Sequence, residues 1–194
     1  MCIVITFQAN YLNSASIKRI NTYKPSIKKV AFVEINPNNP SDVLALHKAA
    51  IKWDKTGGEG FAYDICEAVN KGKPDRFFAL TTQHDRFDNL NFKQILSLAQ
   101  VKTESKGEQY IEFLQVDPEN SNKSEEPEFS HIGTAMLNCL KNIFIDKTIE
   151  LDSVKSAISF YLRNGFTDAG PSGGGERRMY WEHNLSTLHK KITC

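Results

Sequence analysis

The stretch Ser130-His131-Ile132-Gly133-Thr134-Ala135 stands where a predicted strand, Tyr110–Val116, and an acidic loop give way to a predicted helix, Gly133–Ile143. Small residues at such a junction leave several backbone N–H groups without an acceptor, at the positive end of a helix dipole. A helix end of this kind attracts anions, and several N–H groups suit a pyrophosphate better than a single carboxylate. The stretch therefore predicts an anion site at the start of a helix.

A second pattern, Ala157-x-x-x-Tyr161-x-x-x-Gly165-Phe166, lies on a predicted helix over Val154–Asn164. The glycine-rich turn Gly170–Gly175 and a predicted last strand, Arg177–Glu182, follow it. Tyr161 stands one turn before Gly165, and a glycine there can also end the helix as a C-cap. Taken alone, the pattern fits a functional tyrosine or an aromatic residue packed in the core.

In their order and spacing, the two patterns resemble the motifs of the GNAT superfamily of N-acyltransferases. The family's pyrophosphate motif, Gln/Arg-x-x-Gly-x-Gly/Ala, reads Ser130-x-x-Gly133-x-Ala135 here, and the resemblance covers Phe77 to Trp181. Two features depart from the family: Ser130 replaces the Gln or Arg, and the loop Asp117–Phe129 is longer than the usual turn. The resemblance implies an α/β fold with a mixed, mostly antiparallel sheet flanked by helices.

The resemblance also implies an acyl-coenzyme A-dependent N-acyltransferase, with acetyl-CoA as cosubstrate and no metal. Backbone groups of the strand end would pair with the pantetheine arm, and the N–H groups from Ile132 to Ala135 would bind the pyrophosphate with the Ser130 and Thr134 hydroxyls. His131 and Arg163 could reach the same coenzyme, although solvated surface positions explain both equally well. The residues expected at the coenzyme site are Leu114, Gln115, Val116, Ser130, His131, Ile132, Gly133, Thr134, Ala135, Phe160 and Arg163.

Two catalytic residues are expected from the same comparison. In the family, the tyrosine at the position of Tyr161 returns a proton to the leaving thiolate, and a phenol is protonated at neutral pH. An amine nucleophile also needs a general base within hydrogen-bond reach. Glu112 is the candidate, because a charge inside a strand is costly unless it is paired or functional. Glu34 is its rival, and ordinary edge solvation would explain either carboxylate.

The composition indicates one globular domain: 194 residues, 40% hydrophobic and 24% charged. The net charge of +1 gives no general attraction to nucleic acid or to an anionic membrane, so neither is predicted as a partner, while a homodimer is allowed. The scattered cysteines form no Cys-x-x-Cys pair, which argues against a metal site and fits a cytoplasmic protein. They are Cys2, Cys66, Cys139 and Cys194.

We expect residues 1–29 to form an N-terminal extension, β-prone over Met1–Phe7 and irregular over Gln8–Lys29, before a single domain over 30–194. A helix begins after Ser41 as N-cap, and a second runs over Phe61–Asn70. The first helix would bury Val43, Leu44, Leu46, Ala50 and Ile51. Further strands are expected at Val30–Ile35, Arg76–Thr82, Ile95–Val101 and Ile149–Leu151, with a mobile acidic loop at Lys123–Glu128.

Two functions from different classes stay open. The first is the acyltransferase, which would acetylate a primary amine on a small molecule or a protein by direct transfer. The second is a GNAT-fold coenzyme-binding or regulatory protein that has lost catalysis. By resemblance, Leu44–Asn70 and Gly170–Arg178 would build the acceptor cleft. Apolar walls would come from Trp53, Phe61 and Tyr63, and attraction for a cationic amine from Asp54, Glu59 and Asp64.

Overall fold

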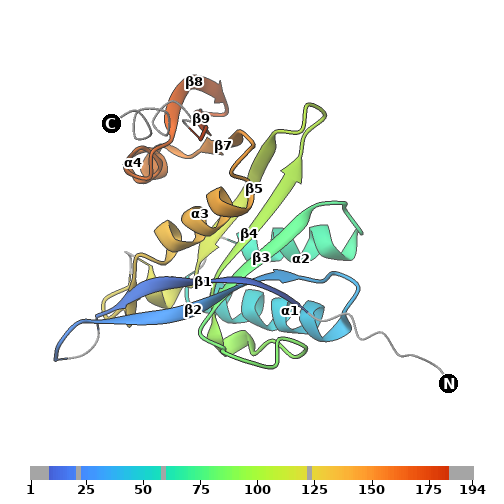
Figure 1. Cartoon of the computed structure of the whole chain (residues 1–194), viewed down its shortest axis with the longest axis vertical. Helices are drawn as coiled ribbons and strands as arrows, with labels where there is room; N and C mark the ends of the chain where they lie inside the picture. Colours follow the sequence, from blue (N-terminus) through green and yellow to red (C-terminus); the bar gives the residue numbers. More distant parts are fainter. Residues whose placement is uncertain (1–8, 21–22, 58–59, 122–123, 184–194) are drawn as a thin grey trace, which may run out of the picture. The chain divides into compact units, whose positions relative to one another are not determined.

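The computed structural model describes residues 9–20, 23–57, 60–121 and 124–183 (Figure 1). The chain forms two compact units, and each is described by itself. Unit one comprises Met1–Lys102 and Glu112–Cys139, and unit two comprises Thr103–Ile111 and Leu140–Cys194. The predicted β-prone run Met1–Phe7 lies outside the described residues, and the expected domain boundary at residue 30 stays a prediction.

Unit one is built on an antiparallel sheet in which β1 pairs with β2, β2 with β3, and β3 with β4. Its strands are β1 (Asn10–Arg19), β2 (Ser26–Ile35), β3 (Arg76–Thr81), β4 (Ile95–Thr103), the end of β5 (Gln109–Val116) and the short β6 (Phe129–Ser130). The sequence Val30–Ile35 is apolar almost throughout, as expected for a strand covered on both faces, and it is buried except at Glu34. The predicted strands of this unit are confirmed.

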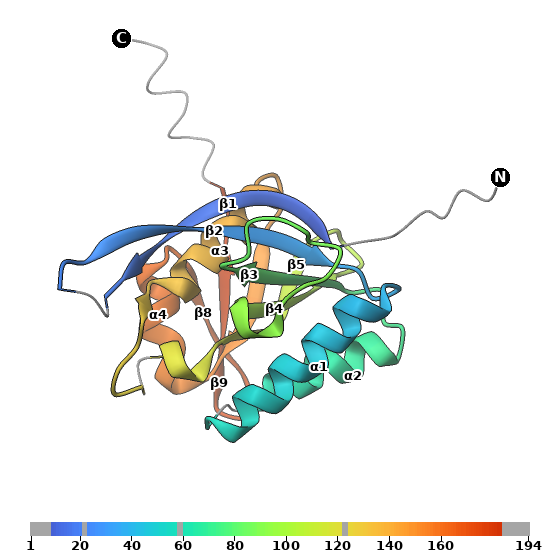
Figure 2. The same ribbon diagram turned by 90° about the horizontal axis from the view of Figure 1, so that it is seen from below.

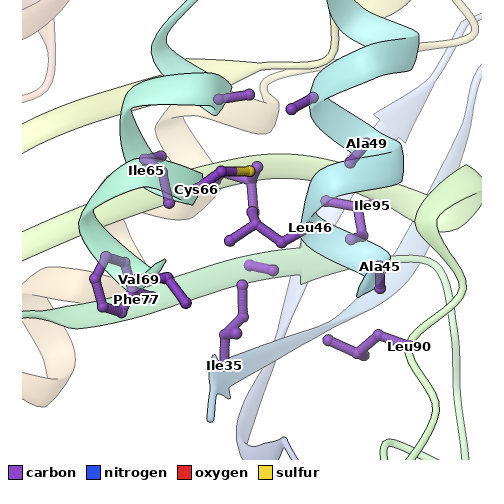
Figure 3. Close-up of a cluster of buried hydrophobic side chains, with 14 of the residues drawn as sticks. Ile35, Ala45, Leu46, Ala49, Ile65, Cys66, Val69, Phe77, Leu90 and Ile95 are labelled. Carbon is purple, nitrogen blue, oxygen red and sulfur yellow. The ribbon is translucent and has the colours of Figure 1, made fainter. Parts of the chain in front are cut away.

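Two helices, α1 (Pro40–Lys55) and α2 (Phe61–Asn70), run side by side against this sheet (Figure 2). Their small and aliphatic side chains meet the sheet in one core cluster that includes Leu46, Ile65 and Phe77 (Figure 3). The N-cap of α1 is Asn39, whose side chain accepts from the Ser41 N–H at 3.1 Å, so the prediction of Ser41 was wrong by two residues.

The buried face of α1 also differs from the predicted one. Leu44 and Ile51 are exposed, whereas Ala45, Ala49 and Trp53 are buried. Alanine contributes little to a hydrophobic pattern, so the predicted buried face followed the larger aliphatic residues instead of the alanines. The narrow, alanine-lined face lets α1 approach α2 and the sheet closely.

The N-terminal segment is the main correction to the predicted fold. Residues expected to be irregular form β1, which is hydrogen-bonded to β2 along its length and to β6 at Lys18 and Arg19. Ile17 is the only fully buried apolar residue of this strand, so the apolar alternation that marks a half-buried strand is missing. Backbone pairing, which the side chains do not reveal, decides the structure here.

Unit two is a smaller sheet with two short helical segments. The start of β5 pairs in parallel with β7 (Ile149–Ser153), which pairs antiparallel with β9 (Glu176–Trp181), and β9 pairs with β8 (Thr167–Gly173). The helix predicted over Val154–Asn164 is shorter: a 3-10 turn at Lys155–Ala157 leads into α4 (Ile158–Arg163). The glycine-rich segment is mostly strand, because only Gly174 and Gly175 form the turn of the β8–β9 hairpin.

The helix α3 (Ile132–Ile143) begins in unit one and ends in unit two. With it, the mixed α/β fold and the mostly antiparallel sheet flanked by helices are confirmed. Among the described residues, the search for a membrane-crossing helix finds none with the necessary length and apolar character.

Candidate active site

The start of α3 presents three backbone donors. Its first helical hydrogen bond runs from the Ala135 N–H to the His131 carbonyl at 2.9 Å, which makes His131 the N-cap. Within the described part of the chain, no acceptor is found for the N–H groups of Ile132, Gly133 and Thr134, and the helix geometry supplies none. Of the four N–H groups expected at the anion site, Ala135 is already bonded, which leaves three without a partner among the described residues.

His131 adopts a left-handed backbone conformation with φ of 65°, which is uncommon for a residue with a side chain. Its side chain is exposed, and its Nδ1 lies 3.0 Å from the Ser130 hydroxyl oxygen. The exposed position of His131 agrees with the surface alternative in the sequence analysis.

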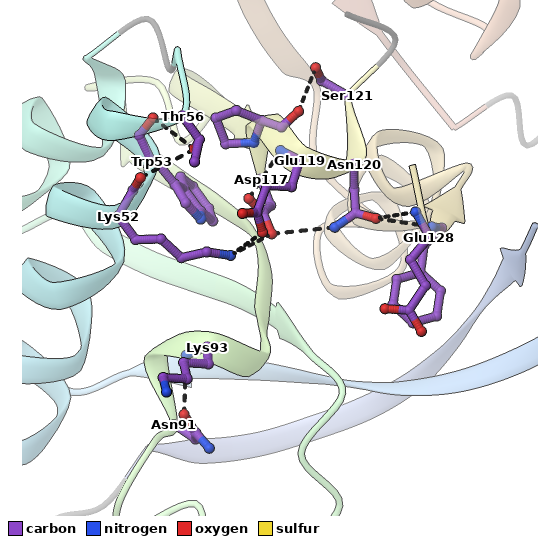
Figure 4. A network of polar contacts seen from close by, with 12 residues as sticks. Lys52, Trp53, Thr56, Asn91, Lys93, Asp117, Glu119, Asn120, Ser121 and Glu128 are labelled. Carbon is purple, nitrogen blue, oxygen red and sulfur yellow. Dashed lines mark hydrogen bonds and ion pairs between the residues drawn. The ribbon is translucent and has the colours of Figure 1, made fainter. Parts of the chain in front are cut away.

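The loop before α3 is tied together across its two ends, and the mobility predicted for Lys123–Glu128 stays a prediction. The Asn120 side-chain oxygen accepts from the N–H groups of Glu128 at 3.1 Å and Phe129 at 2.9 Å (Figure 4). Phe129 is buried and pairs with Arg19 of β1, while Arg19 also forms an ion pair of 2.9 Å with Glu128. These contacts fix the position of the residues that enter α3.

The end of β5 is fixed by a buried carboxylate that the sequence analysis did not single out. Asp117 is 2% exposed and lies 3.3 Å from the Lys52 ammonium of α1, which also pairs with Glu119 at 2.7 Å (Figure 4). Burial raises the pKa of the Asp117 carboxyl, and the Lys52 charge opposes that shift. Only the Asp117-Pro118 pair at the end of a strand hinted at this cap.

Gln115, one of the predicted pantetheine-binding residues, is occupied on both its backbone and its side chain. Its carbonyl accepts from the Ser97 hydroxyl at 2.9 Å, and its side-chain oxygen accepts from the Ala62 N–H of α2 at 2.8 Å. The backbone of its neighbours Leu114 and Val116, both half-buried, is left as the better candidate for pairing with a ligand. Gln115 instead ties the start of α2 to the sheet.

Both candidate bases carry an ion pair. Glu112 lies 2.6 Å from the Lys102 ammonium, and Glu34 makes two hydrogen bonds of 2.7 and 2.9 Å to the Arg76 guanidinium. All four side chains are half-buried. Each carboxylate is engaged by a neighbouring cation, so an amine would reach its oxygens only after that partner moved.

Tyr161 lies in unit two, near the C-terminal end of α4. The hydrogen bonds of that helix end account for the spacing of Tyr161, Gly165 and Phe166. The Phe166 N–H donates to the Tyr161 carbonyl at 3.1 Å and the Gly165 N–H to the Leu162 carbonyl at 2.9 Å, which is the Schellman pattern. The rings of Tyr161 and Phe166 are 5.6 Å apart, edge to face. The spacing of Tyr161, Gly165 and Phe166 therefore serves helix capping.

The Tyr161 hydroxyl differs in pKa from a solvent-exposed phenol. Desolvation raises its pKa to about 12, so it keeps its proton at any physiological pH. Among the residues that the structure describes, none forms a hydrogen bond with it. Its neighbour Phe160 packs against the ring at 5.1 Å, and Arg163 is exposed. These three residues lie in unit two, whereas the remaining predicted site residues lie in unit one.

The predicted walls of the acceptor cleft are only partly available. Trp53 is 1% exposed and belongs to the core, so it lines no cleft. Phe61 stacks on Phe113 with ring centroids 5.4 Å apart, and Tyr63 is exposed. Glu59 lies outside the described residues. Across the ranges that the structure describes, no group of three His, Cys, Asp or Glu side chains gathers as a metal site.

Comparison with known proteins identifies the architecture. No family model matches the sequence, and no curated protein matches it. Solved structures do match. A protein described as an N-acetyltransferase from Lactobacillus plantarum superposes with a TM-score of 0.54 at 9% identity, covering 78% of this chain and 96% of that one. A protein described as a GNAT-family acetyltransferase from Desulfovibrio desulfuricans gives 0.52 at 16% identity, with 78% and 96% coverage.

A third structure, a GNAT-family acetyltransferase from Listeria monocytogenes, superposes with a TM-score of 0.51 at 12% identity, covering 80% of this chain and 95% of that one. This chain has the GNAT fold. The resemblance is thereby confirmed for the architecture. The similarity covers at least 95% of each of these three solved structures and at least 78% of this chain.

Proposed function

We propose that this protein is an acyl-coenzyme A-dependent N-acyltransferase that acetylates a primary amine on a small molecule or a protein. The observation that carries the proposal is the start of α3 in a chain with the GNAT fold, where the N–H groups of Ile132, Gly133 and Thr134 find no acceptor among the described residues. Fold and donors point to the same ligand, an acyl-coenzyme A with a pyrophosphate.

The residues of unit one suit the coenzyme. The three N–H donors and the positive end of the α3 dipole favour a doubly charged pyrophosphate, with the Ser130 and Thr134 hydroxyls as further donors. The backbone of Leu114 and Val116 would pair with the amides of the pantetheine arm. When bound, acetyl-coenzyme A would supply an activated acyl thioester, and a backbone N–H near Val116 would polarise its carbonyl.

The proton transfers would be divided between two side chains. Tyr161 holds its proton firmly and would donate it to the departing thiolate, which is the role of the family's tyrosine at this position. Glu112, or a water molecule, would accept the proton of the amine. Holding both reactants in line would itself supply much of the rate.

A second candidate, a coenzyme-binding protein without catalysis, is favoured by one observation. Both carboxylates that could serve as the base are ion-paired, Glu112 with Lys102 and Glu34 with Arg76. If neither pair opens, the amine keeps its proton and the thioester is bound but not consumed.

Turnover with acetyl-CoA separates the two candidates. Thiol release is measured against a panel of amines: a polyamine, a peptide with a free N-terminus, and a peptide whose only amine is a lysine side chain. The enzyme proposal expects thiol release with at least one class, abolished when that amine is blocked. Binding of coenzyme with no release across the panel would support the second candidate instead.

A further inference from the structure

Charge is unevenly distributed along the chain. The first 33 residues contain five of the 24 Lys and Arg residues and none of the 23 Asp and Glu residues. The remainder therefore carries 19 basic and 23 acidic residues, a net charge of −4. The overall charge of +1 hides this separation. The basic residues are Lys18, Arg19, Lys24, Lys28 and Lys29.

The fold collects these residues on one hairpin of unit one, made of β1 and β2. Figures 1 and 2 both show the end of the hairpin where β1 leads into β2 lying away from α1. We call residues 14–20 and 23–29 the basic arm. Toward its tip, Tyr23 is 99% exposed and Ile27 is 73% exposed, so these two side chains are open to solvent.

The two faces of the basic arm differ. On one face Arg19 is already paired with Glu128, and Ile17 is buried. On the other face Ser16 pairs with Lys29 across the strands, and Lys18 pairs with Ile27. Side chains of residues directly opposite each other in an antiparallel pair lie on the same face.

This second face combines cations and hydroxyls without a carboxylate. Ser14, Ser16, Lys18, Ile27 and Lys29 are all exposed. Farther along β2, the same face continues with Ala31 and Val33, which are buried in the core cluster with α1 and α2. The helices therefore cover the inner half of the face and leave the outer half open.

We propose that the open face and tip of the basic arm bind RNA that carries an unpaired loop beside a helical stem. Lysine, serine and tyrosine side chains are among the groups that contact phosphates in nucleic-acid interfaces. The fully exposed Tyr23 ring would stack on an unpaired base, which RNA loops offer and continuous duplexes do not. The proposal goes beyond acyl transfer and against the expectation drawn from net charge alone.

The composition of the face disfavours other occupants. Lysine and serine are depleted at protein–protein interfaces, whose centres are rich in aromatic residues. A membrane surface would need a cluster of apolar side chains, whereas Ile27 lies opposite Lys18 and next to Lys29 on this face. RNA offers phosphates to pair with the lysines and a base to stack on the exposed Tyr23 ring.

Fluorescence anisotropy with a labelled RNA hairpin tests the proposal. We expect the full chain to bind at low salt, with affinity falling as salt rises because phosphate contacts release counterions. Lys18→Glu combined with Lys29→Glu should weaken binding about tenfold or more. Tyr23→Ala should weaken binding of the looped RNA roughly fivefold or more, and leave a blunt RNA duplex unaffected.

The matched control is Lys106→Glu combined with Lys155→Glu, two exposed lysines outside the basic arm. It makes the same change in net charge and should alter affinity less than twofold, with an unchanged melting temperature for both double variants. Equal weakening by the two double variants would overturn the proposal, as would no binding of RNA by the wild type. Binding of phosphatidylserine vesicles, or of DNA as tightly as RNA, would overturn it too.

Discussion

Asp42 shows how one side chain can make the stability of the whole protein depend on pH. It is fully buried at the start of α1, where its oxygens accept from the Asn36 N–H and the Asn39 side-chain amide, both at 3.0 Å. Burial outweighs these hydrogen bonds and raises its pKa to about 6. The folded protein therefore binds a proton at Asp42 more tightly than the unfolded chain does.

The sign of the effect follows from linkage. The stabilising contribution of this proton is fully present below the unfolded pKa near 3.8 and is lost as pH rises through about 6. Between pH 4 and 7 the group should cost the wild type about 2–3 kcal/mol of unfolding free energy. Asp42→Asn has no carboxyl group to titrate at this position, so its unfolding free energy should lack this pH-dependent contribution. Denaturant unfolding of both proteins at several pH values measures it, and parallel pH curves would show that the assignment is wrong.

Tyr161 carries the chemical prediction at this scale. Tyr161→Phe keeps the ring, its packing on Phe160 and Phe166 and the capped helix end, and removes only the hydroxyl that carries the proton. If the phenol is the general acid, kcat should fall about 10²–10⁴-fold with coenzyme affinity unchanged. Steady-state kinetics with the best amine of the panel provide the measurement. A variant with wild-type kcat across the pH range would remove Tyr161 from the chemistry.

At the scale of elements, helix ends and loop anchors fix where helices stop and where loops run. The end of α4 depends on Gly165, whose φ of 78° is left-handed. A Cβ atom at this position would meet nothing within 4 Å, so only the backbone conformation resists a side chain. Gly165→Ala should therefore cost about 1 kcal/mol of unfolding free energy. Chemical denaturation checks this, and an unchanged stability would argue against the capping role.

The anchor of the loop before α3 is Asn120. Its side chain satisfies two backbone N–H groups that become unpaired in Asn120→Ala, so this variant should lose about 1–3 kcal/mol of unfolding free energy. Asn142, exposed on α3, is the matched control, because Asn142→Ala removes the same group with no comparable contact. Thermal or urea unfolding distinguishes the two. Equal, small losses would mean that the loop is not held by Asn120.

At the scale of elements, the sequence predicts what apolar patterns and turn residues specify. The helix at Phe61–Asn70 follows from such a pattern with both ends correct, and the strands at Val30–Ile35 and Tyr110–Val116 follow with later starts than those observed. It fails for β1, where a polar chain is held by backbone hydrogen bonds to β2 and β6. It also misses the Lys52–Asp117 pair, since residues so far apart in the chain meet only through packing.

At the scale of the whole molecule, the GNAT architecture could be predicted because two local motifs and the order of elements agreed. The candidate site was predictable only where it consists of backbone, as at Ile132–Thr134. Side-chain roles depend on partners that the sequence does not reveal, as the ion pairs of Glu112 and Glu34 show. Even Tyr161-x-x-x-Gly165-Phe166 has a structural meaning, helix capping, beside the chemical one.

The central claim is that the start of α3 binds coenzyme A, and calorimetric titration tests it most directly. The wild type should bind coenzyme A, whereas Gly133→Glu should abolish binding because its side chain and charge would occupy the pyrophosphate position. A carboxylate in the first turn favours the helix dipole, so this variant should stay folded. Asn138→Glu, an exposed change on the same helix, should bind as the wild type does. Absent binding by the wild type, or equal affinity in Gly133→Glu, would contradict the claim.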